Sequence, residues 1–119
     1  MIPSMTPYKC GDVVLLPFPF TDLSTTKQRP ALIISSDWYN DNRNDVIVVA
    51  ITSHIPAKRG EEEYLLSDPE QKSAALPKAS IIKVTKIISI DHRLIRRIIG
   101  HLPKDTINKV KNLLNKFVG

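Results

Sequence analysis

Short, wholly apolar runs separated by turn-forming residues are the feature that most constrains how this chain can fold. Val13–Leu16 and Val46–Ile51 contain no polar side chain and are rich in β-branched residues. Runs of this length and composition are typical of strands that are buried on both faces. We therefore expect a small β structure whose central strands are covered on both sides.

Further runs of the same kind extend the predicted sheet. Additional strands are expected at 31–35, at 63–66, at 80–90 (long and bent) and at 96–102. Ser36 and Asp37 can cap a short helix through residues 38–40, whereas the polar segment 67–73 is predicted to be a turn. Short strands in this number, followed by one terminal helix, predict a small twisted barrel that is mainly β with some α structure.

The chain ends in a predicted amphipathic helix. Pro103 suits its start, and Asp105 places an anion near the positive end of the helix dipole. Apolar residues then recur along one helical face, namely Ile107, Val110, Leu113, Leu114 and Phe117. We expect this helix to pack across the barrel, with a contact in a dimer as the alternative.

Composition places the chain among globular proteins and predicts a single domain over residues 1–119. No apolar run approaches the roughly 18 residues that a membrane span needs, and the N-terminus lacks the features of a signal peptide. The single cysteine, Cys10, excludes an internal disulfide and a multi-cysteine zinc site. Together these features predict a protein of the reducing cytoplasm.

The charge balance favours an anionic partner. The formal net charge is +5 and the pI is about 9.5, with most of the excess lysine and arginine in the second half of the chain. Such a field suits nucleic acid or an acidic protein segment, although it also serves solubility alone.

One cation stands out because of where the chain places it. Pro30 restricts Arg29 to extended backbone at the mouth of a strand, just after the polar loop 21–28. If this strand pairs antiparallel with the next one, Arg29 and Thr52–Ser53 fall at the same end of the sheet. A guanidinium and a hydroxyl in one pocket would suit a phosphodiester.

Other kinds of site find little support. No glycine-rich phosphate loop is present, and His54, His92 and His101 are too scattered to suggest metal-ligand spacing. Nothing in the sequence supplies a partner that would activate Cys10 as a nucleophile. We expect neither a metal nor another cofactor.

The order and spacing of several motifs resemble the MazF/PemK family of toxin endoribonucleases. The matching segments, which span nearly the whole chain, are Gly11–Val14, Phe18–Asp22, Lys27–Leu32, Thr52–Ser53, then Ser80, Lys83 and Lys86, and finally Gly100–Leu102. The resemblance implies an SH3-like (CcdB/MazF-type) small barrel with a C-terminal helix. It also implies a homodimer, and metal-independent, sequence-specific cleavage of single-stranded RNA.

By motif position, Arg29 and Thr52 match the family's catalytic pair, and loop 21–28 matches its substrate loop. The remaining candidate RNA-binding residues are Thr21, Lys27, Gln28, Ser53, Ser80, Lys83 and Lys86. Ser53 or His54 could assist the chemistry, and Phe18 and Phe20 could stack on bases or pack in the core. The family also implies an antitoxin with a DNA-binding domain and an extended tail, through which toxin and antitoxin co-repress transcription.

Two departures and two alternatives complete this interpretation. Pro17–Pro19 replaces an acidic residue that many members carry after the first strand, and residues 55–76 match nothing in the family pattern. One alternative function is a non-enzymatic toxin on the same barrel that binds a protein such as DNA gyrase, which the apolar end 117–119 would serve. The other alternative is a catalytically silent module that binds RNA or antitoxin.

Overall fold

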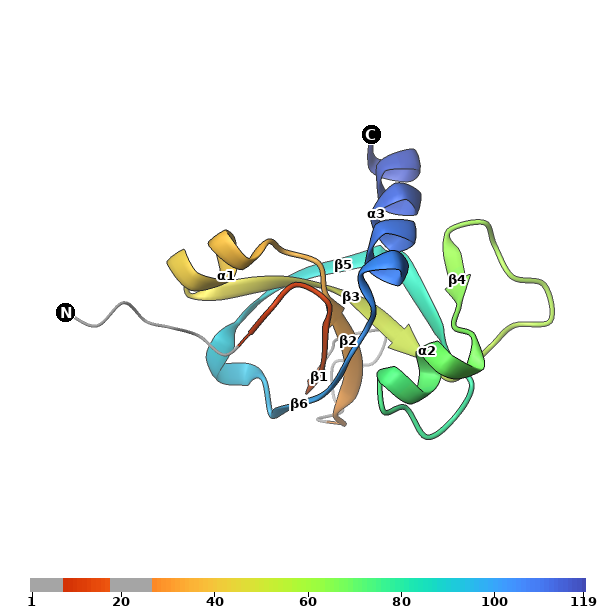
Figure 1. The fold of residues 1–119 in the computed structure, drawn as a ribbon, viewed down its shortest axis with the longest axis horizontal. Helices are drawn as coiled ribbons and strands as arrows, with labels where there is room; N and C mark the ends of the chain where they lie inside the picture. The colour runs from red at the N-terminus through yellow and green to blue at the C-terminus, as the bar shows by residue number, and fades with distance from the viewer. Residues whose placement is uncertain (1–7, 18–26) are drawn as a thin grey trace.

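The computed structural model describes residues 8–17 and 27–119, in which one curved antiparallel sheet carries three α-helices (Figure 1). The strand order in the sheet is β4-β5-β3-β2-β1-β6. The strands are β1 (Asp12–Leu16), β2 (Arg29–Ile33), β3 (Asp45–Thr52), β4 (Glu63–Leu65), β5 (Ile81–Asp91) and β6 (Arg97–His101). The helices are α1 (Asp37–Asn42), α2 (Asp68–Ser73) and α3 (Lys104–Val118), with a 3₁₀ turn η1 (His92–Leu94) before β6.

The central strands are buried on both faces, as their wholly apolar sequences predict. Alternate residues of β1, β2 and β3 enter two separate clusters. Val13 of β1 packs in the cluster that α3 covers, whereas its neighbour Val14 packs with Ile90 and Ile95. Because successive side chains of a strand point to opposite faces, the part of a strand that lies between two apolar layers is apolar at consecutive positions.

The predicted bend in the long strand β5 is confirmed by a slip in its pairing with β3. Val49 lies opposite Ile87, but the next residue, Ala50, lies opposite Lys83. Residues 84–86 therefore lack partners in β3, and extra residues of this kind bend a strand and increase its twist. The first part of β5 pairs with β4, and the second part runs along β3 toward η1.

Strand β2 begins two residues earlier than the sequence predicts and ends two residues earlier. Arg29 and Pro30 pair with Leu16 and Leu15 of β1. At the other end, the amides of Ile34 and Ser35 both donate to the Ile47 carbonyl, which ends the regular ladder. Arg29 is therefore part of the sheet and is held by its backbone.

The segment predicted as a turn at 67–73 is instead the helix α2, so that expectation was wrong. Ser67 accepts a hydrogen bond from the Glu70 amide while the Glu70 carboxylate accepts one from the Ser67 amide, which forms a capping box. The prediction missed the helix because its six residues, five polar ones and Pro69, show no apolar periodicity.

Helix α2 fills the space between the two edge strands of the sheet. On one side, the Tyr64 hydroxyl of β4 donates to the Glu70 carboxylate over 2.7 Å. On the other side, Gly100 of β6 lies directly against the backbone of Ala74. Thr106 of α3 also donates to Glu70, so α2 joins both edges of the sheet to the terminal helix.

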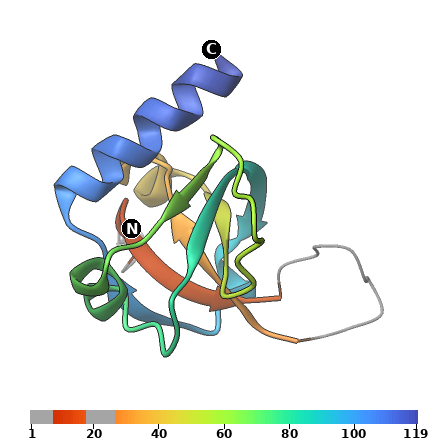
Figure 2. The ribbon, with the colours of Figure 1, turned by 90° about the vertical axis from the view of Figure 1, so that its right-hand side faces the viewer.

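Helix α3 crosses one end of the sheet, as predicted (Figure 2). Ile107 and Val110 in its first half are buried in the core, whereas Phe117 and Val118 at its end are exposed. No helix in the described part of the chain combines the length and apolar character that a membrane crossing requires.

We predict that Gly100→Ala destabilises the protein by about 1–3 kcal/mol, the usual cost of overpacking. A Cβ at this position would lie 2.4 Å from the Ala74 carbonyl carbon, and backbone cannot move aside easily. Gly60→Ala is the matched control, because its Cβ would meet only the flexible Glu62 side chain. Urea unfolding of both variants checks this, and equal losses of stability would contradict it.

A second prediction concerns the buried Glu70. Burial alone would raise its pKa, but hydrogen bonds from Ser67, Thr106 and Tyr64 outweigh it and hold the pKa below the ordinary value. Glu70→Gln, which replaces an acceptor-only group by an amide, should cost about 1–3 kcal/mol at pH 7. The wild-type advantage should be complete above pH about 4.3, the ordinary pKa, and should fade as the pH drops through the lowered pKa.

Urea unfolding at pH 7 and at about pH 3 tests the Glu70 prediction. Glu61→Gln is the control, because Glu61 forms an exposed ion pair with Lys116 and should contribute little. A difference between wild type and Glu70→Gln that is the same at both pH values would contradict the prediction.

Candidate active site

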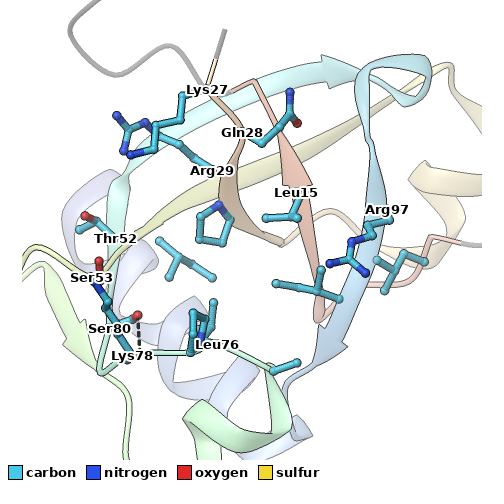
Figure 3. Close-up of a pocket in the computed structure, with 16 residues that line it drawn as sticks. Leu15, Lys27, Gln28, Arg29, Thr52, Ser53, Leu76, Lys78, Ser80 and Arg97 are labelled. Atoms are coloured by element: carbon cyan, nitrogen blue, oxygen red, sulfur yellow. Dashed lines mark hydrogen bonds between the residues drawn. The ribbon is translucent and has the colours of Figure 1, made fainter. Parts of the chain in front are cut away.

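One end of the sheet carries a pocket of about 600 Å³ (Figure 3). Its walls come from segments far apart in the sequence: the end of β1, the start of β2, the end of β3, the connection 75–80 after α2 and the start of β6. A volume of this size is typical of sites that hold a small molecule or part of a larger ligand.

Arg29 and Thr52 both line this pocket, as the predicted antiparallel pairing requires. Ala31 of β2 lies opposite Ala50 of β3. Arg29 precedes Ala31 by two residues and Thr52 follows Ala50 by two, so both fall at the same end of the sheet. The two residues therefore line the same pocket although 23 positions separate them in sequence.

The hydroxyl groups of the pocket form different hydrogen bonds. The Thr52 hydroxyl oxygen accepts a hydrogen bond from the His54 amide over 3.1 Å, which leaves its proton available for a ligand. The Ser80 hydroxyl donates to the Lys78 carbonyl over 2.9 Å and is buried. Ser53 also lines the pocket, whereas His54 is exposed and does not.

All the charged residues in the described lining of the pocket are cations. Four cations line it, namely Lys27, Arg29, Lys78 and Arg97, and no aspartate or glutamate is among the described lining residues. A cleft with one sign of charge attracts ligands of the other sign. Our sequence interpretation did not single out Lys78 or Arg97 as site residues, because no local motif marks them and only the packing of α2 and the pairing of β6 bring them here.

Apolar side chains form another part of the lining. Leu15, Pro30, Leu76 and Ile98 contribute to it, and Ile98 is 38% exposed. At the edge of the same pocket, the Gln28 side-chain oxygen is buried and finds no hydrogen-bond partner in the described part of the chain. A buried acceptor without a donor is unfavourable.

The wall at 75–78 is set by the way in which α2 ends. The amide of Ala75 donates to the Lys72 carbonyl and the amide of Leu76 donates to the Gln71 carbonyl, which is the Schellman pattern. Ala75 has a φ of 56°, a conformation that glycine adopts more easily. The tight end of the helix turns the chain back toward the pocket.

Two predicted RNA-binding residues, Lys83 and Lys86, lie outside the pocket. Lys83 of β5 is 3.8 Å from the Glu63 carboxylate, and Lys86 is exposed within the bend of β5. Thr21, together with Phe18 and Phe20, lies outside the described residues. Within the described ranges no cluster of histidine, cysteine, aspartate and glutamate could hold a metal ion.

Solved structures of related proteins share this architecture. An endoribonuclease from a mycobacterial species superposes with a TM-score of 0.74 at 19% identity, over 97% of this chain and 94% of that one. MazF from Deinococcus radiodurans gives 0.72 at 25% identity, over 94% and 96%. A MazE–MazF complex from the same organism gives 0.73 at 26% identity, over 94% and 96%. The fold is thus the MazF-type small barrel with a C-terminal helix, as predicted.

Comparison at the level of sequence gives two results. No curated protein matches the chain. The family model described as PemK-like, MazF-like toxin of type II toxin–antitoxin system matches residues 9–118. That match includes every described strand and helix and all the residues of the pocket, so the protein belongs to the PemK/MazF toxin family of type II toxin–antitoxin systems.

Proposed function

We propose that this toxin is a sequence-specific, metal-independent endoribonuclease that cuts single-stranded RNA. The observation that carries the proposal is the shared position of Arg29 and Thr52 in a pocket whose charged residues, among those that the structure describes, are all cations. The similarity to MazF from Deinococcus radiodurans and to the mycobacterial endoribonuclease supports the same activity.

In the proposed reaction the 2′-hydroxyl of the RNA attacks the adjacent phosphorus. The bond from phosphorus to the 5′-oxygen breaks, a proton from the 2′-hydroxyl is lost, and the leaving 5′-oxygen takes up a proton. The products are a 2′,3′-cyclic phosphate and a 5′-hydroxyl. DNA has no 2′-hydroxyl and would therefore not be cut.

Arg29 is proposed to stabilise the negative charge that develops on the phosphorane. A guanidinium stays protonated at any ordinary pH, so it is a poor base but a good fixed cation for phosphate oxygens. Thr52 is proposed to orient the scissile phosphate. Its hydroxyl oxygen accepts from the His54 amide, and its proton would be donated to a phosphate oxygen. Ser53, close by in the lining, would add a further hydrogen bond or assist the chemistry.

The remaining contacts are proposed by position. Lys27 and Gln28, which line the pocket, would bind RNA there. Ser80 would act by holding Lys78. Lys83 and Lys86 would touch only an RNA that extends beyond the pocket, and Thr21 is retained from the family motif.

The proposed partners follow from the family. Solved structures contain MazF with MazE from Deinococcus radiodurans, and a mycobacterial endoribonuclease with its cognate antitoxin. We propose that this toxin forms a homodimer in the cytoplasm. A cognate antitoxin would cover its RNA site with an extended tail and would supply the DNA-binding domain.

A toxin that binds a protein such as DNA gyrase is the second candidate. Phe117 and Val118 favour it, because they are 43% and 65% exposed at the end of α3 and could contact a protein. Neither this candidate nor a silent binding module needs the hydroxyl and guanidinium that meet in the pocket.

The central prediction is that Arg29→Ala lowers RNA cleavage by about 10²–10³-fold, the usual effect of losing one preorganised donor. Purified protein is incubated with a long single-stranded RNA in EDTA, and the ends of the fragments are analysed. Wild type should cut at defined sequences and leave 5′-hydroxyl ends. Arg96→Ala is the control, because Arg96 is exposed and lies outside the pocket. A folded, toxic wild type that cuts none of several diverse RNAs would point to the protein-binding alternative.

The Thr52 hydroxyl is tested by a pair of substitutions. Thr52→Val keeps the shape but removes the hydroxyl, and we expect a loss of about 10-fold or more, as for a hydrogen bond to a charged group. Thr52→Ser keeps the hydroxyl and should retain most of the activity. Single-turnover cleavage rates of the two variants give the comparison, and equal rates would remove Thr52 from the proposed mechanism.

A further inference from the structure

Arg97 is a second guanidinium in the pocket, and no motif of the sequence assigns it a role. It is the first residue of β6 and pairs with Leu15 of β1. On the other side of β1, Leu16 pairs with Arg29. The two arginines therefore flank β1 at neighbouring register positions, and Figure 3 shows them on either side of Leu15.

The spacing of the strands sets the distance between these cations. Neighbouring strands lie about 4.8 Å apart, so the backbones of Arg29 and Arg97 are separated by about 10 Å across β1. Both side chains line one continuous pocket. Arg97 is exposed, and it forms no ion pair within the described residues. It is thus available to an anion of a ligand that enters from solvent.

The surface between the two arginines is apolar. Leu15 shares a face of the sheet with its two partners, Pro30 and Arg97. Arg29 pairs with the next residue, Leu16, so it starts from the opposite face and reaches the same pocket at the end of the sheet. Ile98, next to Arg97, also lines the pocket. Cations at both ends of an apolar surface match the alternation of phosphate, base and phosphate along a nucleic acid strand.

We propose that Arg97 binds the phosphate next to the scissile one, while the nucleotide between these phosphates packs on the apolar surface of Leu15, Pro30 and Ile98. This inference rests on the proposed ribonuclease function and extends it from one phosphate to a dinucleotide step. Arg97 is a substrate-binding residue in this account, because the bond that breaks lies at Arg29 and Thr52.

An acidic protein segment is the competing occupant of a basic pocket. The observations favour RNA because the cations alternate with apolar surface in a concave pocket of about 600 Å³. The carboxylates of an acidic peptide would require only positive charge for binding. The exposed lysines elsewhere on the protein could bind them equally well.

The test pairs a charge deleted from the protein with a charge deleted from the RNA. A short RNA that contains one cleavage site is made as a series, each member with one phosphate replaced by an uncharged methylphosphonate. Cleavage of the series is measured in EDTA with wild type, Arg97→Ala and the control Arg96→Ala. Arg96 precedes Arg97, has the same charge and does not line the pocket.

We expect Arg97→Ala to lower kcat/KM by about 10-fold, mainly through KM, because it removes a phosphate contact away from the reacting bond. Neutralising one phosphate adjacent to the cleavage site should weaken wild type and Arg96→Ala but leave Arg97→Ala unaffected. The dependence of cleavage on salt should also become shallower in Arg97→Ala.

Two results would overturn the inference and leave the ribonuclease function intact. In the first, every methylphosphonate weakens Arg97→Ala as much as wild type. In the second, Arg97→Ala cuts RNA normally but escapes inhibition by an acidic antitoxin peptide. A wild type that cuts no RNA at all would instead remove the proposed function, and the inference with it.

Discussion

The buried carboxylate of Glu70 holds together the part of the molecule on which the site depends. It accepts hydrogen bonds from Tyr64 of β4, from Thr106 of α3 and from the cap of its own helix α2. A charge removed from water is tolerated only when its lone pairs are satisfied, so these three elements are fixed relative to one another. Because the connection that follows α2 forms one wall of the pocket, the same network positions Lys78.

The opposite walls depend on the register of the sheet. Antiparallel pairing places the start of β2 beside the end of β3, and it places the start of β6 on the far side of β1. Cations that the sequence scatters thus converge at one end of the sheet, while its apolar residues stay inside. The pocket exists because the strands end there, and side chains beyond the last apolar layer can face solvent and ligand.

Much of this arrangement could be predicted from particular residues. The apolar runs at 13–16 and 46–51 predicted buried strands, and the meeting of Arg29 with Thr52 required only antiparallel pairing of neighbouring strands. Helix α2 was missed, since its six residues include no apolar side chain apart from a proline and so show no helical periodicity. Its capping box and its proline near the start were the available signals. Lys83 was assigned to the site because it matched a family motif, but in the structure it lies beside Glu63.

The sequence by itself determined the layers, the position of Arg29 at the mouth of a strand, the terminal helix and the family. Each of these features follows from local periodicity or from short motifs, so it can be predicted without knowing which distant residues come into contact. Only the tertiary structure decided that Lys78 and Arg97 join Arg29 in one positive pocket. Arg97 lies in the pocket because β6 pairs with β1, a strand more than 80 residues earlier. Lys78 lies there because α2, which it follows, packs against both edge strands of the sheet. Long-range packing sets both positions, and no local pattern encodes them.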